Sequence, residues 1–139
     1  MATLLGEVEL ELKKYNISPE QAGILVVVSA LGEDAIPSEI SRWLLRKPHT
    51  ISSIIDRMVN KGLINKKSDL KHKNRRKITL TKKGVEIHSM LRENNTINRM
   101  MSSLSEEEKQ QLKTSLGKLR TIAFKILGEI DRPVFPVYR

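Results

Sequence analysis

The apolar residues of the stretch 48–61 recur with the period of an α-helix. They stand at positions i, i+3, i+4, i+7 and i+8, which places them in one stripe along a single helix face. The stripe consists of Ile51, Ile54, Ile55, Met58 and Val59. The other side carries short or cationic side chains, among them Thr50, Ser53, Arg57 and Asn60. The pattern predicts a helix that packs one face into a core and leaves a polar face outside.

A basic β-hairpin is predicted directly after this helix. Gly62 ends the helix, and the stretch 63–67 has the pattern of a strand that pairs with a second strand at 77–80. The loop between the strands runs from Ser68 to Arg76 and is rich in Lys and Arg. A helix with a small polar outer face beside a cationic hairpin is a surface suited to nucleic acid.

Two further helices are predicted near the N-terminus. An amphipathic pattern covers residues 4–15. Ser18 and Gln21 then form a capping box around a proline, which starts a helix that runs from 19 to 31 and ends at Gly32. These signals outweigh a run of isoleucine, leucine and valine that favours a strand by propensity alone.

A short helix is predicted between Ile36 and about Arg46. It ends there because Lys47 precedes Pro48, and the residue before a proline is pushed out of the α region. Its inward residues are Ile40, Trp43 and Leu44. Together with the helix of 48–61 it forms a helix-turn-helix, although the turn lacks the usual glycine.

Two long helices are predicted after the hairpin. Thr81 caps the first, which continues to about Ser102, while Gly84 and the Asn94–Asn95 pair are poor helix formers and allow a bend or a break. A capping box at 105–108, with three acids at the positive end of the helix dipole, starts the second.

The last helix carries an apolar seam with heptad spacing. Steps of four and three residues connect its members, which are Leu112, Leu116, Leu119, Ala123, Ile126 and Ile130. Such a seam requires a partner helix. The partner is the preceding long helix of the same chain, the same helix in a second copy, or both, and a second copy makes the protein a homodimer.

The net charge of +9 is concentrated in one stretch of the chain. Between Pro48 and Gly84 the sequence has 11 Lys and Arg against 2 acidic residues, whereas the remainder has 14 of each. Confined basicity is the electrostatic footprint of a protein that binds a polyanion. A membrane surface usually needs an amphipathic helix whose bulky apolar face is left outside, and the helix of 48–61 uses that face in the core. We therefore expect nucleic acid as the partner and not a membrane.

Composition argues against several kinds of chemistry. The 139 residues suit a single domain, and the absence of cysteine excludes disulfides and thiolate metal sites, in keeping with a cytoplasmic protein. No stretch has the roughly 18 apolar residues of a membrane span, and no secretory signal is recognisable. His49, His72 and His88 are dispersed without ligand spacing, and no phosphate-binding glycine loop or catalytic constellation is found. We expect no metal, no cofactor and no catalytic activity.

Three stretches, in this order, resemble the MarR family of winged-helix transcription regulators. Residues 17–21 resemble the start of the family's second helix, and residues 50–58 with 61–64 resemble its recognition helix and glycine exit. Residues 78–84 resemble the strand that leaves the wing and ends in Leu-Thr-x-Lys-Gly. The resemblance extends from the first of these stretches to the C-terminus. The chain departs from the family in the wing tip, which lacks the Asp of a common Asp-x-Arg element, and in its shorter first helix.

The resemblance implies a mainly α fold with a small β-hairpin wing. A single MarR-like domain would span residues 1–139. Within it, residues 18–84 would form a winged helix-turn-helix DNA-binding lobe, and residues 1–17 and 85–139 a helical dimerisation lobe.

The resemblance and the charge pattern together define a candidate DNA-binding surface. From the recognition helix we expect the major groove to be read by His49, Thr50, Ser52, Ser53 and Arg57. From the wing we expect contacts to phosphates or the adjacent minor groove by Lys71, His72, Lys73, Asn74, Arg75 and Arg76. Ordinary helix surface is the alternative for each hydroxyl, and a solvated charge run is the alternative for the wing.

A two-fold dimer would place two recognition helices in successive major grooves, so the expected partner is a pseudo-palindromic operator in double-stranded DNA. The resemblance also implies a repressor that releases DNA when a small ligand binds, although the few aromatic residues indicate no particular sensor pocket. The alternative is a winged-helix module for protein–protein contacts without sequence-specific DNA binding. Such a module would associate with an acidic protein in a salt-insensitive way.

Overall fold

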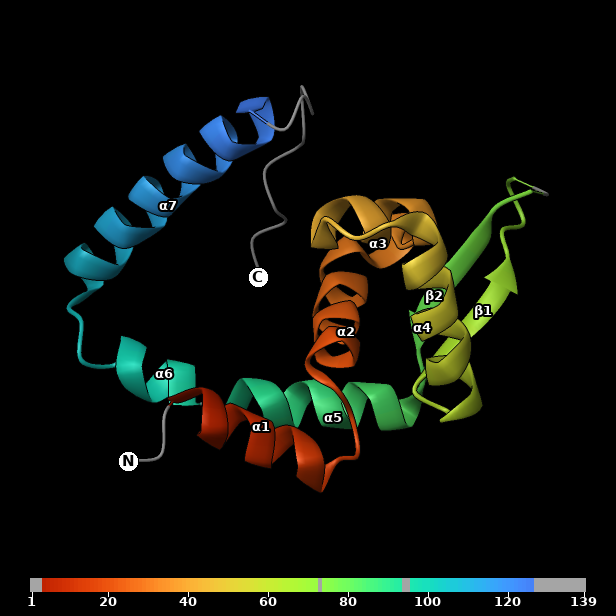
Figure 1. Cartoon of the computed structure of the whole chain (residues 1–139), viewed down its shortest axis with the longest axis horizontal. Helices are drawn as coiled ribbons and strands as arrows, with labels where there is room; N and C mark the ends of the chain where they lie inside the picture. Colours follow the sequence, from red (N-terminus) through yellow and green to blue (C-terminus); the bar gives the residue numbers. More distant parts are fainter. Residues whose placement is uncertain (1–3, 73, 94–95, 127–139) are drawn as a thin grey trace. The chain divides into compact units, whose positions relative to one another are not determined.

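The computed structural model describes residues 4–72, 74–93 and 96–126, which form two compact units (Figure 1). The first unit contains α1 (Leu4–Lys14), α2 (Pro19–Leu31), the 3₁₀ turn η1 (Gly32–Asp34), α3 (Pro37–Leu44), α4 (Pro48–Asn60), β1 (Ile64–Ser68), β2 (Arg76–Leu80) and α5 (Lys82–Glu93). The second contains α6 (Thr96–Met101) and α7 (Glu106–Ile126). The predicted fold class, mainly α with a small β-hairpin, is confirmed.

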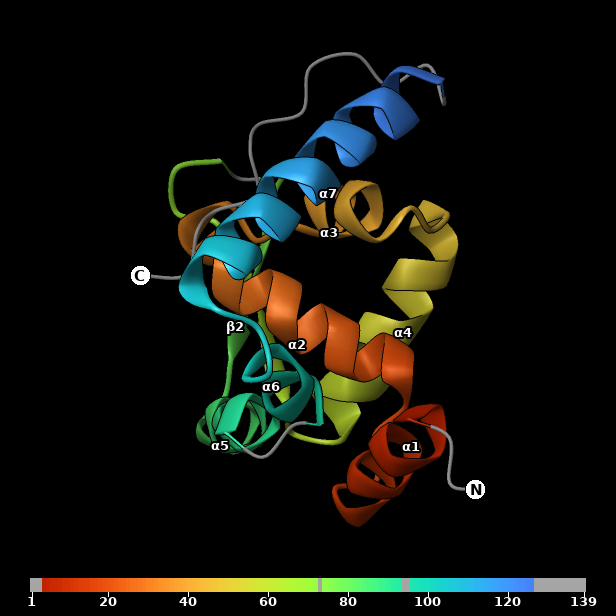
Figure 2. The same cartoon turned by 90° about the vertical axis from the view of Figure 1, so that its left-hand side faces the viewer.

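α2 is the central helix of the first unit. It contacts α1, α3, α4, α5 and β2, and two perpendicular views show these elements around it (Figure 1, Figure 2). A helix with neighbours on most of its sides has apolar residues around most of its circumference, so a segment with strand-like propensity is helical here. The predicted capping box is present, because Ser18 Oγ accepts from the Gln21 N–H at 3.2 Å and Gln21 Oε1 accepts from the Ser18 N–H at 3.1 Å.

The core of the first unit lies between α2, α3, α4 and the base of the hairpin. Its largest fully buried side chains are Ile24, Leu25, Ile40, Ile51, Ile55, Met58, Leu63, Ile64 and Ile78. The predicted stripe of α4 is inside, with Ile54 also buried and Val59 half-buried. The prediction that α4 packs one face into the core is confirmed.

α3 ends at Leu44, so the prediction that it continues to about Arg46 is wrong. Leu45 takes a left-handed conformation with φ +52°, and the Arg46 N–H donates to Ser41 O at 3.1 Å. The Ser41 hydroxyl in turn donates to Arg46 O at 2.6 Å. These bonds close the helix end, and Leu45 supplies the conformation for which glycine is usually chosen. Of the residues predicted to face inward, Ile40 is buried while Trp43 and Leu44 are half-buried.

The hairpin is antiparallel, and its register pairs Ile64 with Leu80 and Ser68 with Arg76. β1 begins one residue later than predicted, because both backbone groups of Leu63 are used elsewhere. Its N–H donates to Met58 O at 3.0 Å, and its carbonyl accepts from the Thr81 N–H at 3.1 Å.

This second bond belongs to a junction at the base of the hairpin. The Thr81 hydroxyl donates to Gly62 O at 2.6 Å and accepts from the Gly84 N–H at 3.1 Å, which confirms Thr81 as the N-cap of α5. A Cβ on Gly84 would lie 2.1 Å from Leu63 O. The backbone of α5 therefore rests directly on the carbonyl of Leu63, and only glycine leaves room for it.

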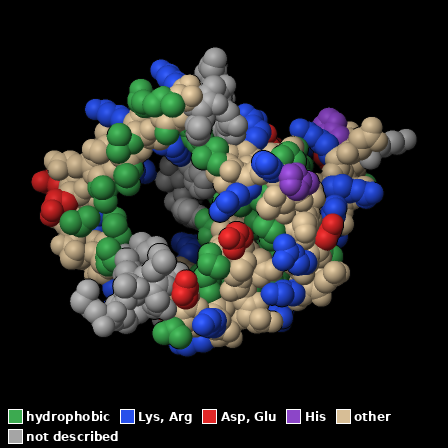
Figure 3. All heavy atoms as spheres, in the orientation of Figure 1, with side chains coloured by type: hydrophobic (Ala, Val, Ile, Leu, Met, Phe, Trp, Pro, Cys, Tyr) green, Lys and Arg blue, Asp and Glu red, His purple; other side chains and the backbone are tan. Residues whose placement is uncertain are grey.

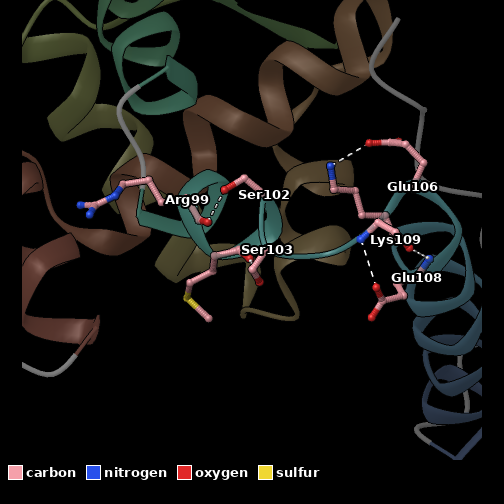
Figure 4. Close-up of polar contacts among 8 residues, drawn as sticks. Arg99, Ser102, Ser103, Glu106, Glu108 and Lys109 are labelled. Atoms are coloured by element: carbon pink, nitrogen blue, oxygen red, sulfur yellow. Dashed lines mark hydrogen bonds and ion pairs between the residues drawn. The ribbon is translucent and has the colours of Figure 1, made fainter.

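The predicted long helix after the hairpin is divided into α5, which ends at Glu93, and α6, which begins at Thr96. Asn94 and Asn95, where a break was allowed, lie outside the described residues. α7 starts with the predicted capping box, in which Ser105 Oγ accepts from the Glu108 N–H and Glu108 Oε1 accepts from the Ser105 N–H, both at 3.2 Å. Figure 4 shows this start, together with the ion pair between Lys109 and Glu106 at 2.9 Å.

The apolar seam of α7 is exposed. None of the α7 residues is buried, and the exposed fraction rises from 37% at Leu112 to 67% at Leu119 and 79% at Ile126. Leu116 and Ala123 are also exposed, and Ile122 adds an exposed apolar side chain that the heptad spacing did not include. Ile130 lies outside the described residues.

Gly84→Ala is expected to lower the free energy of unfolding by about 3 kcal/mol, the upper end of the range for overpacked sites. The methyl group would collide with a carbonyl oxygen that the Thr81 N–H holds in place. Urea denaturation followed by circular dichroism measures the change.

Gly117→Ala is the matched control, because a Cβ there meets nothing within 4 Å. This change should leave stability equal or raise it by about 0.5–1 kcal/mol, the usual gain for alanine over glycine in a helix. If the Gly84→Ala variant were as stable as the wild type, the close contact between Gly84 and the Leu63 carbonyl would be contradicted.

His88 is the buried titratable side chain of α5. Burial, and secondarily the positive charge of Arg92, lower the pKa of His88 below its ordinary value of 6.5. The unfolded chain regains the ordinary pKa. Between the two values the unfolded state therefore binds more protons than the folded state.

The free energy of unfolding should consequently be highest above pH 6.5 and fall as the pH drops from 6.5 through the lowered pKa of His88. His88→Gln should remove this component, because glutamine does not titrate. Urea midpoints measured from about pH 5 to 8 compare the slopes. His72→Gln, which changes an exposed histidine, serves as control. An identical slope in wild type and His88→Gln would show that His88 does not contribute.

Candidate nucleic-acid interface

The outer face of α4 presents short polar side chains, as predicted. His49, Ser53 and Arg57 are exposed, while Thr50 and Ser52 are half-buried at the edge of the core. Arg57 Nε donates to Ser53 O at 3.4 Å, so the arginine stem lies back along the helix. α4 thus offers hydroxyl, imidazole and guanidinium groups on one side, all of which hydrogen-bond to base edges or phosphates.

The described wing residues of the predicted set are all at the surface. Lys71, His72, Asn74, Arg75 and Arg76 are exposed, and Lys73 lies outside the described residues. In the space-filling view, Lys and Arg side chains gather over α4 and the hairpin (Figure 3).

The register divides the hairpin side chains between two faces. Cross-strand partners share a face, and neighbours along a strand point to opposite faces. One face, which we call the α4 face, carries Ile64, Lys66 and Ser68 opposite Leu80, Ile78 and Arg76. The other, which we call the groove face, carries Asn65 and Lys67 opposite Thr79 and Lys77.

An ion pair joins the α4 face of the hairpin to α4. Lys66 Nζ lies 3.1 Å from Asp56 Oδ1 on the exposed side of α4. An exposed pair of this kind contributes no more than about 1 kcal/mol, so its main effect is to align the hairpin with α4. On the same face Arg76 Nη1 donates to Ser68 Oγ at 2.7 Å, which positions this guanidinium.

The groove face lines a hollow of about 570 Å³ between the hairpin and η1. Lys67, Lys77 and Arg75 line it from the hairpin, and Glu33 and Asp34 line it from η1. Lys77 forms an ion pair with Glu33. Arg75 and Arg76 therefore lie on different faces of the hairpin although they are adjacent in sequence.

The hairpin is also hydrogen-bonded to the segment between η1 and α3. The Ile78 N–H donates to Ala35 O at 2.8 Å, between η1 and α3. With the Lys66–Asp56 and Lys77–Glu33 pairs, this bond fixes the wing to the helix-turn-helix. Sequence reasoning missed Asp56, Lys66 and Glu33. The lysines of the two strands were visible in the sequence, but the face on which each lies required the register.

Two adjoining hollows lie beside α4 on the side of α2. Their volumes are about 220 and 340 Å³, and both are lined by Glu20, Arg46 and Ile54. Thr50 and Arg57 line the larger one. Their linings combine the apolar Ile54 with the charged side chains of Glu20 and Arg46.

The described residues contain no group of three or more His, Cys, Asp or Glu side chains that could hold a metal ion. Within the same residues, none of the helices has both the length and the apolar character that crossing a bilayer demands.

No protein-family model and no curated protein sequence matches the chain. Solved structures do match. The organohalide-sensing transcriptional regulator RdhR, in its 2,4-dichlorophenol-bound form, is 32% identical, with 93% of this chain and 78% of that chain covered and a TM-score of 0.70.

S. aureus MepR in its DNA-binding conformation is 27% identical, with 84% and 87% of the two chains covered and a TM-score of 0.72. The S. aureus MepR–DNA complex is 25% identical, with 82% and 85% covered and a TM-score of 0.64. The proteins matched are transcription regulators and not enzymes. With the winged helix-turn-helix geometry described above, these likenesses show that the chain belongs to the MarR family of transcription regulators.

Proposed function

We propose that this chain binds double-stranded DNA in a sequence-specific way and regulates transcription as a homodimeric repressor that a small ligand releases. The observation that supports DNA binding best is the Lys66–Asp56 pair, since it holds the cationic hairpin beside the polar face of α4. The major groove admits an α-helix, and a hairpin beside it reaches the flanking backbone and minor groove. MepR, a relative, has been solved as a DNA complex.

Within this proposal His49, Thr50, Ser52, Ser53 and Arg57 read base edges in the major groove. The wing residues contact phosphates and the neighbouring minor groove, Arg76 from the α4 face and Arg75 from the groove face. Residues 18–84 act as the DNA-binding lobe, and residues 1–17 and 85–139 act in dimerisation.

The ligand-release part of the proposal has two supports. RdhR, a relative, binds 2,4-dichlorophenol. In this chain the two hollows beside α4 share Arg46, and Arg57 lines one of them. A ligand that occupied this position would compete with DNA for Arg57 and shift α4.

The proposed function is tested by selecting bound duplexes from a random pool at two salt concentrations. We expect a pseudo-palindromic sequence with half-sites about one helical turn apart, and weaker binding at the higher salt. A winged-helix module for protein contacts would instead return no preferred sequence. It would also bind an acidic protein without salt dependence.

Arg76→Ala and Arg75→Ala should each weaken binding to all duplexes, because each removes a charge that neutralises a phosphate. The plot of log affinity against log salt should flatten by about one unit per lost contact. Fluorescence anisotropy titrations over a range of salt measure both effects. Lys118→Ala, which removes an exposed cation from α7, should leave the slope unchanged. An unaltered slope in both wing variants would remove the wing from the interface.

Leu119→Glu should yield a monomer. Leu119 is the mid-point of the exposed seam, and a carboxylate there would be buried without a partner in a dimer. Sedimentation velocity measures the oligomeric state. Gln110→Glu, an exposed position on the opposite side of α7, introduces the same charge and should keep the dimer. A stable dimer of Leu119→Glu would place the dimer interface elsewhere.

A further inference from the structure

The tip of the hairpin presents a leucine to solvent. Leu70 follows β1, and its side chain is 101% exposed, as in an extended peptide. Among the described residues from 18 to 84, the one other large apolar side chain left exposed is Leu45. Leu70 therefore adds nothing to the hydrophobic stability of this chain.

Hydrogen bonds of Asp69 nevertheless hold the described backbone beside Leu70. The Asp69 carboxylate accepts from the Lys71 N–H at 2.9 Å, and Asp69 O accepts from the His72 N–H at 3.3 Å. The Asp69 N–H donates to Arg75 O, and the Arg75 N–H donates to His72 O, both at 2.9 Å. These bonds restrain the backbone on both sides of Leu70, so little backbone entropy remains to be lost there when the leucine binds a partner.

The hairpin places cations next to this apolar side chain. Lys71 follows Leu70 in sequence, and Arg75 lines the same hollow as Leu70, whose η1 side carries Glu33 and Asp34. A matching partner has an anionic rim and a narrow interior with apolar walls. The minor groove of DNA fits this description, since phosphates form its edges, and leucine is among the side chains that wedge between base steps there.

We propose that Leu70 is an apolar wedge that enters the minor groove beside the site bound by α4 and favours flexible pyrimidine–purine steps at that position. Such steps unstack and kink at low cost, whereas other steps resist the wedge. The inference rests on the proposed function, because α4 and the wing must occupy one duplex. It adds a residue that distinguishes sequences through DNA deformability and not through hydrogen bonds.

The test uses the full chain and two duplexes with the same selected core site. One carries TA steps beneath the wing, and the other carries no pyrimidine–purine step there. We expect the wild type to prefer the first duplex. Leu70→Ser should weaken binding to that duplex about tenfold, which corresponds to the free energy of burying part of a leucine side chain. Its affinity for the second duplex should change much less. The salt slope should stay the same, because no charge is removed.

Two further variants sharpen the result. Leu70→Met keeps an apolar side chain of similar volume and should retain the preference between the duplexes. Arg75→Ala removes a charge and keeps the leucine. It should therefore weaken binding to both duplexes equally and flatten the salt slope. Thermal melting of each variant should match the wild type, because Leu70 is fully exposed.

Equal binding of Leu70→Ser and wild type to both duplexes would overturn the wedge and leave the proposed function standing. An equal loss on both duplexes would also overturn it, since the step preference would be missing. A wild type that binds neither duplex would overturn the proposed function and the wedge together.

Discussion

The carbonyl of Leu63 is the point on which the arrangement of α4, the hairpin and α5 depends. It accepts from the Thr81 N–H, lies under Gly84, and belongs to a residue whose own N–H closes the end of α4. The end of α4, both ends of the hairpin and the start of α5 therefore meet within a few bonds. Any movement of α5 along its axis changes where the hairpin begins, because no side chain separates the two backbones.

Part of the positive charge of the hairpin is used in ion pairs with neighbouring elements. Lys66 and Lys77 are used to hold the hairpin to Asp56 and Glu33, one on each face. These two cations align the wing, while Arg75 and Arg76 remain at the tip end of the strands. The positive charge counted along the sequence thus divides into lysines that form ion pairs within the chain and arginines that lie exposed near the tip of the hairpin.

Capping chemistry and periodicity were enough to predict most helices. Ser18 and Gln21 predicted the start of α2, and Gly32 its end, against the strand propensity of its interior, because the signals at a helix end act locally and can be read from a few residues. The end of α3 was misplaced, since the sequence does not reveal that Leu45 accepts a left-handed conformation. That conformation depends on bonds between Ser41 and Arg46, which form only once the turn is made.

The candidate site was predicted as a set of residues but not as an arrangement. The exposed face of α4 followed from its buried stripe, whereas the assignment of Arg75 and Arg76 to separate faces required the strand register. Because side chains alternate between the two faces along each strand, that register also limits where residues can be inserted or deleted. Losing one codon inside either strand would move the residues between that point and the tip to the opposite face, so a change of length disturbs the two faces least beyond the last ladder pair, Ser68 with Arg76.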